Sequence, residues 1–178
     1  GFDRPLYEQY VTWLGNALQG NWGTSIANGW QVSKLLRIKV WVTFQLAIAA
    51  FIVAIIISIP LGLRTGLKPD GFLARRFLNF YTAFGFAIPS FWLGIMLILF
   101  FGVFLRLLPT SGFKSFFDDP GRALKYLILP AFTQGLPGSV IYSNFISNSV
   151  QEIRKKEYVI AAIAKGLPSH VVIFKHIL

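Results

Sequence analysis

The side chains that could carry out catalysis or bind a metal are few in this chain, and they are poorly grouped. His170 and His176 are the only histidines, and there is no cysteine. Their spacing of six does not place both side chains on one face of a helix, so no zinc site is predicted. Asp118 and Asp119 are adjacent in a turn-rich stretch, where a turn or helix cap is a better prediction than paired-carboxylate catalysis. The sequence therefore predicts no catalytic and no metal-binding residue.

Composition excludes further classes of function. The phosphate-binding motif G-x-x-x-x-G-K-[ST] does not occur, so the chain is not predicted to bind ATP in that manner. The net charge of +10 comes from 17 basic residues that are spread over loops, without the concentrated face that nucleic acid requires. Only 13% of the residues are charged and 54% are hydrophobic, whereas a soluble domain carries about 25% charged residues. These values predict a membrane protein.

Three stretches without Asp, Glu, Lys, Arg or His organise the chain. They lie between Lys39 and Arg64, between Arg76 and Arg106, and between Lys125 and Glu152. Each is longer than the roughly 20 residues that a membrane helix needs. We therefore expect an all-α fold with a transmembrane core over residues 40–151 and spans at about 40–63, 77–105 and 126–150.

The third of these stretches has a polar face. Ser139, Ser143 and Ser147 recur every four residues, and Asn144 widens the same half of the helix. Polar side chains are costly against lipid, so this face is expected to meet other helices or a wet cavity. One interpretation is that these four residues line a translocation path. The alternative is hydrogen bonding between helices without any contact to a solute.

Residues 1–39 precede the first predicted span. Residues 1–19 have the pattern of an amphipathic helix, with Asp3 as the expected N-cap and Pro5 in the first turn. The sequence GNWG at 20–23 predicts the turn that ends it. Four tryptophans precede or begin the first span, which is typical of a segment at a membrane interface. Packing of this helix on the rest of the protein is a compatible alternative.

Residues 152–178 have a helix-break-helix pattern. Ile153, Glu157, Ile160 and Ala164 are spaced as one face of a helix, and Gly166 is placed as the left-handed residue that follows a helix end. Val171, Val172, Phe174 and Lys175 then form a second, short amphipathic pattern. From the spacing alone, a surface helix-turn-helix without a partner is an equally good interpretation.

The sequence EYVIAAIAKGLPSHVVIFKH resembles the cytoplasmic coupling loop, the EAA loop, of bacterial binding-protein-dependent ABC importer permeases. FDRPLYEQYVTWLGNALQGNWGTS, TFQLAIAAFIVAIIISIPLGL, AIPSFWLGIMLILFF, LLPTSGF and LKYLILPAFTQGL are similar to successive segments of the same family, in its oligopeptide, dipeptide and nickel branch. The resemblance covers essentially the whole chain. It departs from the family at Asn21, where Asp is usual, and at Asn144 and Ser147, where Arg is usual.

The resemblance implies a type I ABC importer permease fold, with about three of an expected six spans in this sequence. It implies an extracytoplasmic segment 1–39, a cytoplasmic coupling loop 152–178 and a multi-pass location in the bacterial plasma (inner) membrane. The implied partners are a second homologous permease subunit, two cytoplasmic ATPases, an extracytoplasmic solute-binding protein and the lipid bilayer. ATP and Mg would be bound by the ATPases. The residues implied to couple to them are Glu157, Tyr158, Ala161, Ala162, Lys165 and Gly166.

The function expected from this resemblance is passage of peptides or related small solutes, without catalysis in this chain. Two other classes remain open. One is an ATP-independent membrane channel or a fragment of a secondary transporter. The other is an interaction or sensor subunit that keeps the same architecture without transport.

Overall fold

The computed structural model describes residues 4–68, 71–168 and 171–177, and it divides into two compact units at Gln45 and Leu46. Within the described residues the chain is helical and forms no β-strand, only an isolated bridge between Thr24 and Gln31. The predicted all-α fold is therefore confirmed. Asp3, His170 and the side chain of His176 lie outside the described residues.

The first unit contains α1, which spans Leu6–Leu18, and the turns that follow it. Pro5 is the N-cap rather than a first-turn residue, and the helix begins two residues later than an N-cap at Asp3 would give. Gly20 and Gly23 have positive φ angles and end the helix as predicted. Asn21 accepts a hydrogen bond from the Gly23 amide on its side-chain oxygen, at 3.2 Å. An Asp can accept the same bond, so this departure from the family leaves the turn intact.

Helix α2 spans Val32–Leu67 and contains the predicted span 40–63. It is 36 residues long, or about 54 Å, and among the helices of the described residues it is the single one whose length and apolar composition by themselves suit a membrane crossing. It begins at Val32, eight residues before the predicted start. The basic residues Lys34, Arg37 and Lys39 were expected in the preceding loop, but they lie within the first turns of the helix.

The predicted span 77–105 is not one straight helix. Helix α3 covers Phe72–Ala87, α4 covers Ser90–Leu97 and the π-helix η1 covers Ile98–Phe104, with a bend of 100° between Arg75–Ala87 and Ser90–Phe104. Pro89 causes the break, because it has no N–H to donate and forces the preceding residue out of helical geometry. Ile88 accordingly has an extended backbone, with ψ at 119°. This segment is a broken span or a re-entrant loop.

Helix α5 spans Pro120–Ile153 and contains the third predicted span. Asp119 is its N-cap and accepts a hydrogen bond from the Arg122 amide at 3.0 Å, so the predicted capping role of this aspartate pair is confirmed. Pro130 and Pro137 lie inside the helix without ending it. A three-residue turn leads to α6, Glu157–Ala164, and the last described element is the π-helix η2, Val172–Ile177.

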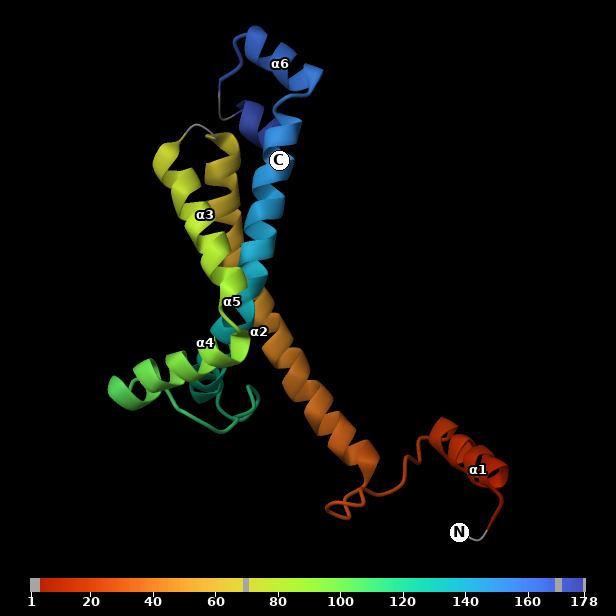
Figure 1. The fold of residues 1–178 in the computed structure, drawn as a ribbon. Helices are drawn as coiled ribbons and strands as arrows, with labels where there is room; N and C mark the ends of the chain where they lie inside the picture. The colour runs from red at the N-terminus through yellow and green to blue at the C-terminus, as the bar shows by residue number, and fades with distance from the viewer. Residues whose placement is uncertain (1–3, 69–70, 169–170, 178) are drawn as a thin grey trace. The chain divides into compact units, whose positions relative to one another are not determined.

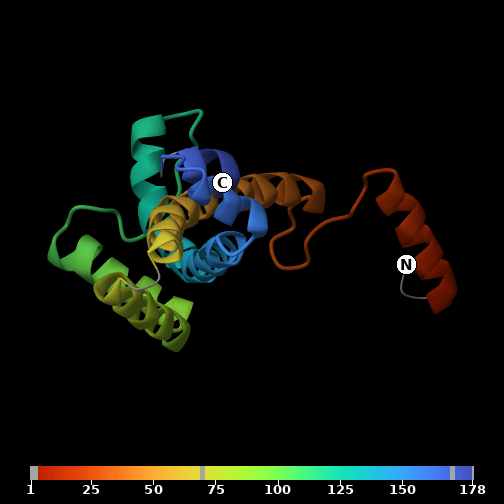
Figure 2. The same cartoon turned by 90° about the horizontal axis from the view of Figure 1, so that it is seen from above.

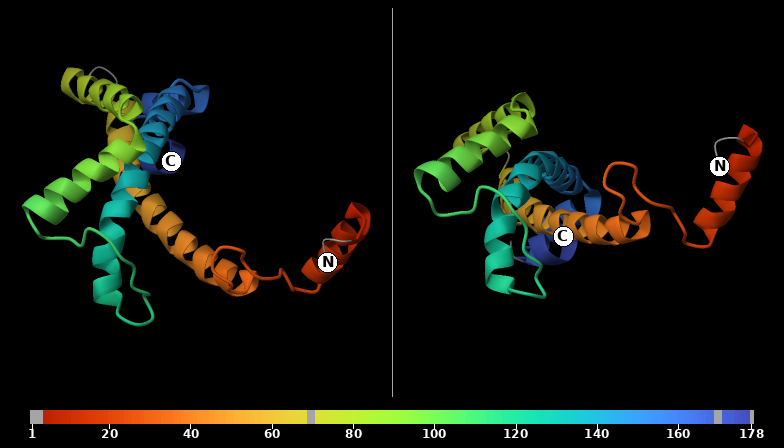
Figure 3. Two further views of the ribbon diagram at one scale, coloured as in Figure 1. Left: turned by 60° about the horizontal axis from the view of Figure 1, so that its bottom comes forward. Right: turned by 90° about the horizontal axis from the view of Figure 1, so that it is seen from below.

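Within the second unit, α5 is the element around which the others pack. Helices α3 and α4 both contact it, on either side of the bend at Pro89 (Figures 1 and 2). The part of α2 that belongs to this unit runs beside α3 and α5. Helix α6 lies with η2 at the C-terminal end of α5 (Figure 3). The loop after η1 returns to the opposite end of α5, so α5 connects the two candidate regions described next.

Candidate coupling loop and the helix seam that carries it

The first part of the candidate coupling segment, residues 152–164, is not one continuous helix. It consists of the end of α5, a short turn and α6. Helix α5 continues through Ile153, and the Lys156 amide donates to the Ile153 carbonyl at 3.0 Å before α6 begins. The predicted common face of Ile153, Glu157, Ile160 and Ala164 is therefore wrong, because the turn changes the helical phase between Ile153 and the other three. Ile160 is 55% exposed.

The inward face of α6 is formed by Val159 and Ala162 instead. Val159 is completely buried and Ala162 is 5% exposed, and both pack in a cluster with Val150 of α5 and Val172 of η2. Partly buried apolar side chains surround this cluster: Leu63 and Leu67 of α2, Ile146 and Ile153 of α5, and Ile173. Helix α6 is thus anchored on the ends of the long helices α2 and α5.

The outward face of α6 is apolar and open. Tyr158, Ile160 and Ile163 are each more than half exposed. Of the six residues expected to couple to an ATPase, Glu157, Tyr158, Ala161, Lys165 and Gly166 are exposed, whereas Ala162 is buried. Ala162 therefore packs α6 against Val150 and Val172. Contact of the other five residues with a partner stays a prediction.

Gly166 adopts the conformation that its position in the sequence predicts. Its φ is +73°, and its amide donates to the Ile163 carbonyl at 2.9 Å to close the helix end. A Cβ added at this glycine would meet no atom within 4 Å. The requirement for glycine is therefore one of backbone conformation rather than of space.

A row of close contacts, called the seam here, joins Gly62 and Gly66 of α2 to α5 next to the end that carries α6. A Cβ at Gly62 would lie 2.7 Å from Ile146 Cβ and 2.8 Å from the Ser143 carbonyl oxygen. One turn further, a Cβ at Gly66 would lie 2.7 Å from Val150 Cβ. The two helices therefore approach as closely as glycine allows. The sequence signal is the small-xxx-small pair Gly62 and Gly66 within GLRTG, which sequence reasoning did not use.

The polar face of α5 is directed into this packing. Ser139, Ser143 and Ser147 are buried, with exposed fractions of 3% or less. The Ser139 hydroxyl is hydrogen bonded to that of Tyr81 in α3, and the Asn144 amide donates to Thr82 Oγ1 at 2.8 Å. These contacts favour the interhelical interpretation of the polar face, and a path-lining role stays a prediction. Asn144 and Ser147, where the family usually has Arg, take part as neutral hydrogen-bonding groups.

Substitutions at Ser143 separate these interpretations. Its hydroxyl donates to the Ser139 carbonyl of its own helix at 2.6 Å, so Ser143→Ala should leave the protein unchanged. Ser143→Leu should destabilise the fold by about 1–3 kcal/mol, because Ser143 is completely buried and the larger side chain would overpack the interior. Thermal unfolding of the purified full-length protein measures both effects. A stable Ser143→Leu protein that assembles normally yet fails in solute uptake would instead support a lining role.

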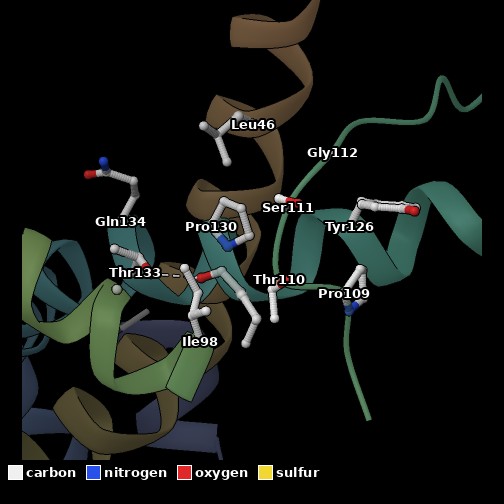
Figure 4. A pocket seen from close by; sticks show the side chains of 12 residues that line it. Leu46, Ile98, Pro109, Thr110, Ser111, Gly112, Tyr126, Pro130, Thr133 and Gln134 are labelled. Atoms are coloured by element: carbon white, nitrogen blue, oxygen red, sulfur yellow. Dashed lines mark hydrogen bonds between the residues drawn. The ribbon is translucent and has the colours of Figure 1, made fainter. Parts of the chain in front are cut away.

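A second region of interest lies toward the other end of α5. A cavity of about 260 Å³ opens between α2, α4, η1, the loop 109–112 and the first turns of α5 (Figure 4). Its polar groups include Thr110, Ser111, Tyr126 and Gln134, and none of the described residues that line it is charged. The Thr133 hydroxyl, also on its wall, donates a hydrogen bond to the Leu129 carbonyl at 2.8 Å. A pocket of this kind suits an uncharged group.

Comparison with known proteins places this architecture. A family model described as the inner membrane component of binding-protein-dependent transport systems matches residues 58–178, which include the seam and the whole coupling segment. The chain belongs to this family. The family resemblance drawn from the sequence is thereby confirmed, and the helical permease fold of the family accounts for the long helices α2 and α5.

Other members of the family share the rest of the chain as well. The oligopeptide transport system permease protein AppB of Bacillus subtilis (strain 168) is 34% identical over 180 residues, which cover 99% of this chain and 56% of that protein. The probable D,D-dipeptide transport system permease protein DdpB of Escherichia coli (strain K12) is 31% identical over 94% of this chain and 55% of its own length. The dipeptide transport system permease protein DppB of Lactococcus lactis subsp. cremoris (strain MG1363) is 28% identical, over 100% and 56%. The chain thus spans little more than half the length of these relatives.

Proposed function

We propose that this chain forms part of a permease subunit of an ABC importer for peptides or related small solutes. The subunit contains the translocation path and catalyses no reaction. It spans the plasma membrane several times, and it works with a second homologous permease subunit and an extracytoplasmic solute-binding protein. Two cytoplasmic ATPases supply the energy, and ATP and Mg are bound by them rather than by this chain.

The arrangement of α6 is the observation that carries this proposal. One face of the helix is fixed to the ends of α2 and α5 through Val159 and Ala162, while the other exposes Tyr158, Ile160 and Ile163. Exposed apolar patches of this kind mark interaction sites. A helix that is anchored on the membrane core and apolar outside is suited to transmit the movement of a docked subunit. A peptide cargo is proposed because the relatives AppB and DppB are permease proteins of oligopeptide and dipeptide transport systems.

The buried serines of α5 have an indirect part in this proposal. We assign Ser139, Ser143, Asn144 and Ser147 to shaping the path by holding α5 against α2 and α3, which accords with their contacts. The cavity is lined on α5 by residues from Tyr126 to Gln134, which lie 27 to 19 residues before the end of α5 at Ile153, or about 40 to 29 Å along the helix. This separation matches the thickness of a bilayer core.

Reconstitution of the full-length protein tests the function. The subunit, its homologous partner and the two ATPases are placed in vesicles with the solute-binding protein, and uptake of a labelled di- or oligopeptide is followed. Uptake that requires both ATP and the binding protein is expected. Equal uptake without ATP would identify a channel, and ATP hydrolysis without uptake of any peptide would favour a sensor or interaction subunit.

The proposed topology makes a separate prediction. Residues 64–76 and 151–178 are expected to face the cytoplasm, with 1–39 and 106–125 outside. Lys114 and Lys155 are both exposed, and the sequence contains no cysteine that would interfere. In intact cells, an impermeant thiol reagent should label the Lys114→Cys variant of the full-length protein and not the Lys155→Cys variant. The reverse labelling would overturn this orientation.

A further inference from the structure

Arg154 occupies the junction between the helix seam and the coupling helix. It is the C-cap residue of α5 and is half-buried. Its Nη1 donates to the Leu67 carbonyl at 2.6 Å and lies 3.3 Å from the Gly66 carbonyl oxygen, at the very end of α2. The last carbonyls of a helix have no partner within the helix, and they form its negative end. A guanidinium group is the side chain best suited to satisfy two of them at once.

The seam brings these groups together. Gly62 and Gly66 face Ile146 and Val150 at successive steps of four residues, and Arg154 follows Val150 at the next such step. Without a side chain at Gly66, the end of α2 lies close enough to α5 for the arginine to reach its carbonyls. Arg154 therefore closes the cytoplasmic end of the seam.

The same end of the seam carries α6. Leu63 and Leu67 of α2 contact the buried cluster formed by Val150 and Val159, so α6 rests on α2 as well as on α5. Only the turn 154–156 connects α5 to α6 covalently, whereas α2 is more than 80 residues away in sequence. Arg154 is the described residue that ties this turn to α2 by hydrogen bonds.

We propose that Arg154 is a positioning residue for energy coupling: it clamps α2, α5 and α6 into one body, so that a movement of α6 reaches both long helices. This inference rests on the proposed function. It goes beyond it by assigning transmission to a residue that lies outside the exposed docking face. Loss of the clamp should therefore leave ATPase attachment intact but weaken the link between ATP hydrolysis and uptake.

The test uses the full-length complex in vesicles and compares Arg154→Gln, Arg154→Lys and, as control, Lys155→Gln. Lys155 is the exposed neighbour in the same turn. Arg154→Gln should lower solute uptake per ATP hydrolysed by about tenfold, the factor expected for loss of one charge-assisted hydrogen bond. Arg154→Lys, which keeps the charge and one donor, should recover part of this loss. Lys155→Gln should match the unaltered protein.

A structural readout accompanies the kinetic one. Spin labels on Lys68→Cys and Ala164→Cys report the separation of the α2 end from α6 in the full-length permease. Their distance distribution should be narrow with Arg154 and broad with Arg154→Gln. An unchanged distribution, or an unchanged ratio of uptake to hydrolysis, would overturn the clamp, as would a parallel fall of uptake and hydrolysis caused by loss of the ATPases. Failure of the unaltered complex to transport would instead refute the proposed function, and the label distances would still test the clamp.

Discussion

Gly166→Val should abolish ATP-driven uptake while the permease still inserts and pairs with its partner subunit. The φ of +73° at this residue is unfavourable for a β-branched side chain, at a cost of roughly 1–2 kcal/mol. That cost is too small to unfold a membrane helix bundle, but it is enough to shift the end of α6 and the residues that follow. Uptake and ATPase co-purification of the full-length complex measure the effect.

The open surroundings of Gly166 provide a sharp control. No atom lies within 4 Å of a Cβ at this position, so bulk alone is harmless and the backbone conformation decides the outcome. Gly166→Asn should retain much of the activity, because asparagine tolerates the left-handed region better than other residues with a side chain. Gly166→Ala should fall between asparagine and valine. Equal activity of the valine and asparagine variants would show that the left-handed turn has no role in coupling.

Gly66→Val and Gly62→Val should prevent the protein from assembling. At Gly66 the new Cβ would overlap Val150, and at Gly62 it would press on the Ser143 carbonyl oxygen, a backbone atom that cannot move aside alone. Separating α2 from α5 would also break the contacts between Arg154 and the end of α2. The expected loss exceeds the roughly 1–3 kcal/mol of ordinary overpacking. Yield and thermal stability of the full-length protein measure it.

Gly15→Ala in α1 is the matched control for the seam. A Cβ there meets nothing within 4 Å, and alanine favours a helix by up to about 1 kcal/mol over glycine. This variant should be at least as stable as the unaltered protein. A Gly66→Val protein with normal yield and stability would contradict the close approach of α2 and α5.

The sequence was most informative where a single local rule decides the structure. Hydropathy alone located the apolar part of α2, and the glycine after a helical stretch predicted the positive φ of Gly166. A turn or a helix cap was predicted for the adjacent pair Asp118 and Asp119, and Asp119 is the N-cap of α5. Each of these features depends on neighbours along the chain, so it leaves a signature in a short window.

Features that depend on distant contacts could not be read in this way. Hydropathy does not reveal the bend at Pro89, because the residues on both sides of it are apolar. The inward face of α6 is set by Val150 and Val172, which lie on other elements, and a three-residue turn changed the phase that a continuous helix would have had. The serine face was correctly identified as polar, but its partners Tyr81 and Thr82 are about 60 residues away.

The seam between α2 and α5 also imposes an order on biosynthesis. Gly62 and Ile146 are 84 residues apart, which takes between about 4 and 17 seconds to synthesise at 5–20 residues per second. During that interval α2 is apolar enough to be stable in lipid by itself, although its glycine face has no helix packed against it yet. Helix α5 is less independent, since Ser139 and Asn144 are hydrogen bonded to Tyr81 and Thr82 of α3. Helix α5 therefore packs in the membrane against helices that were synthesised before it, and this part of the fold forms in the order α2, α3, α5.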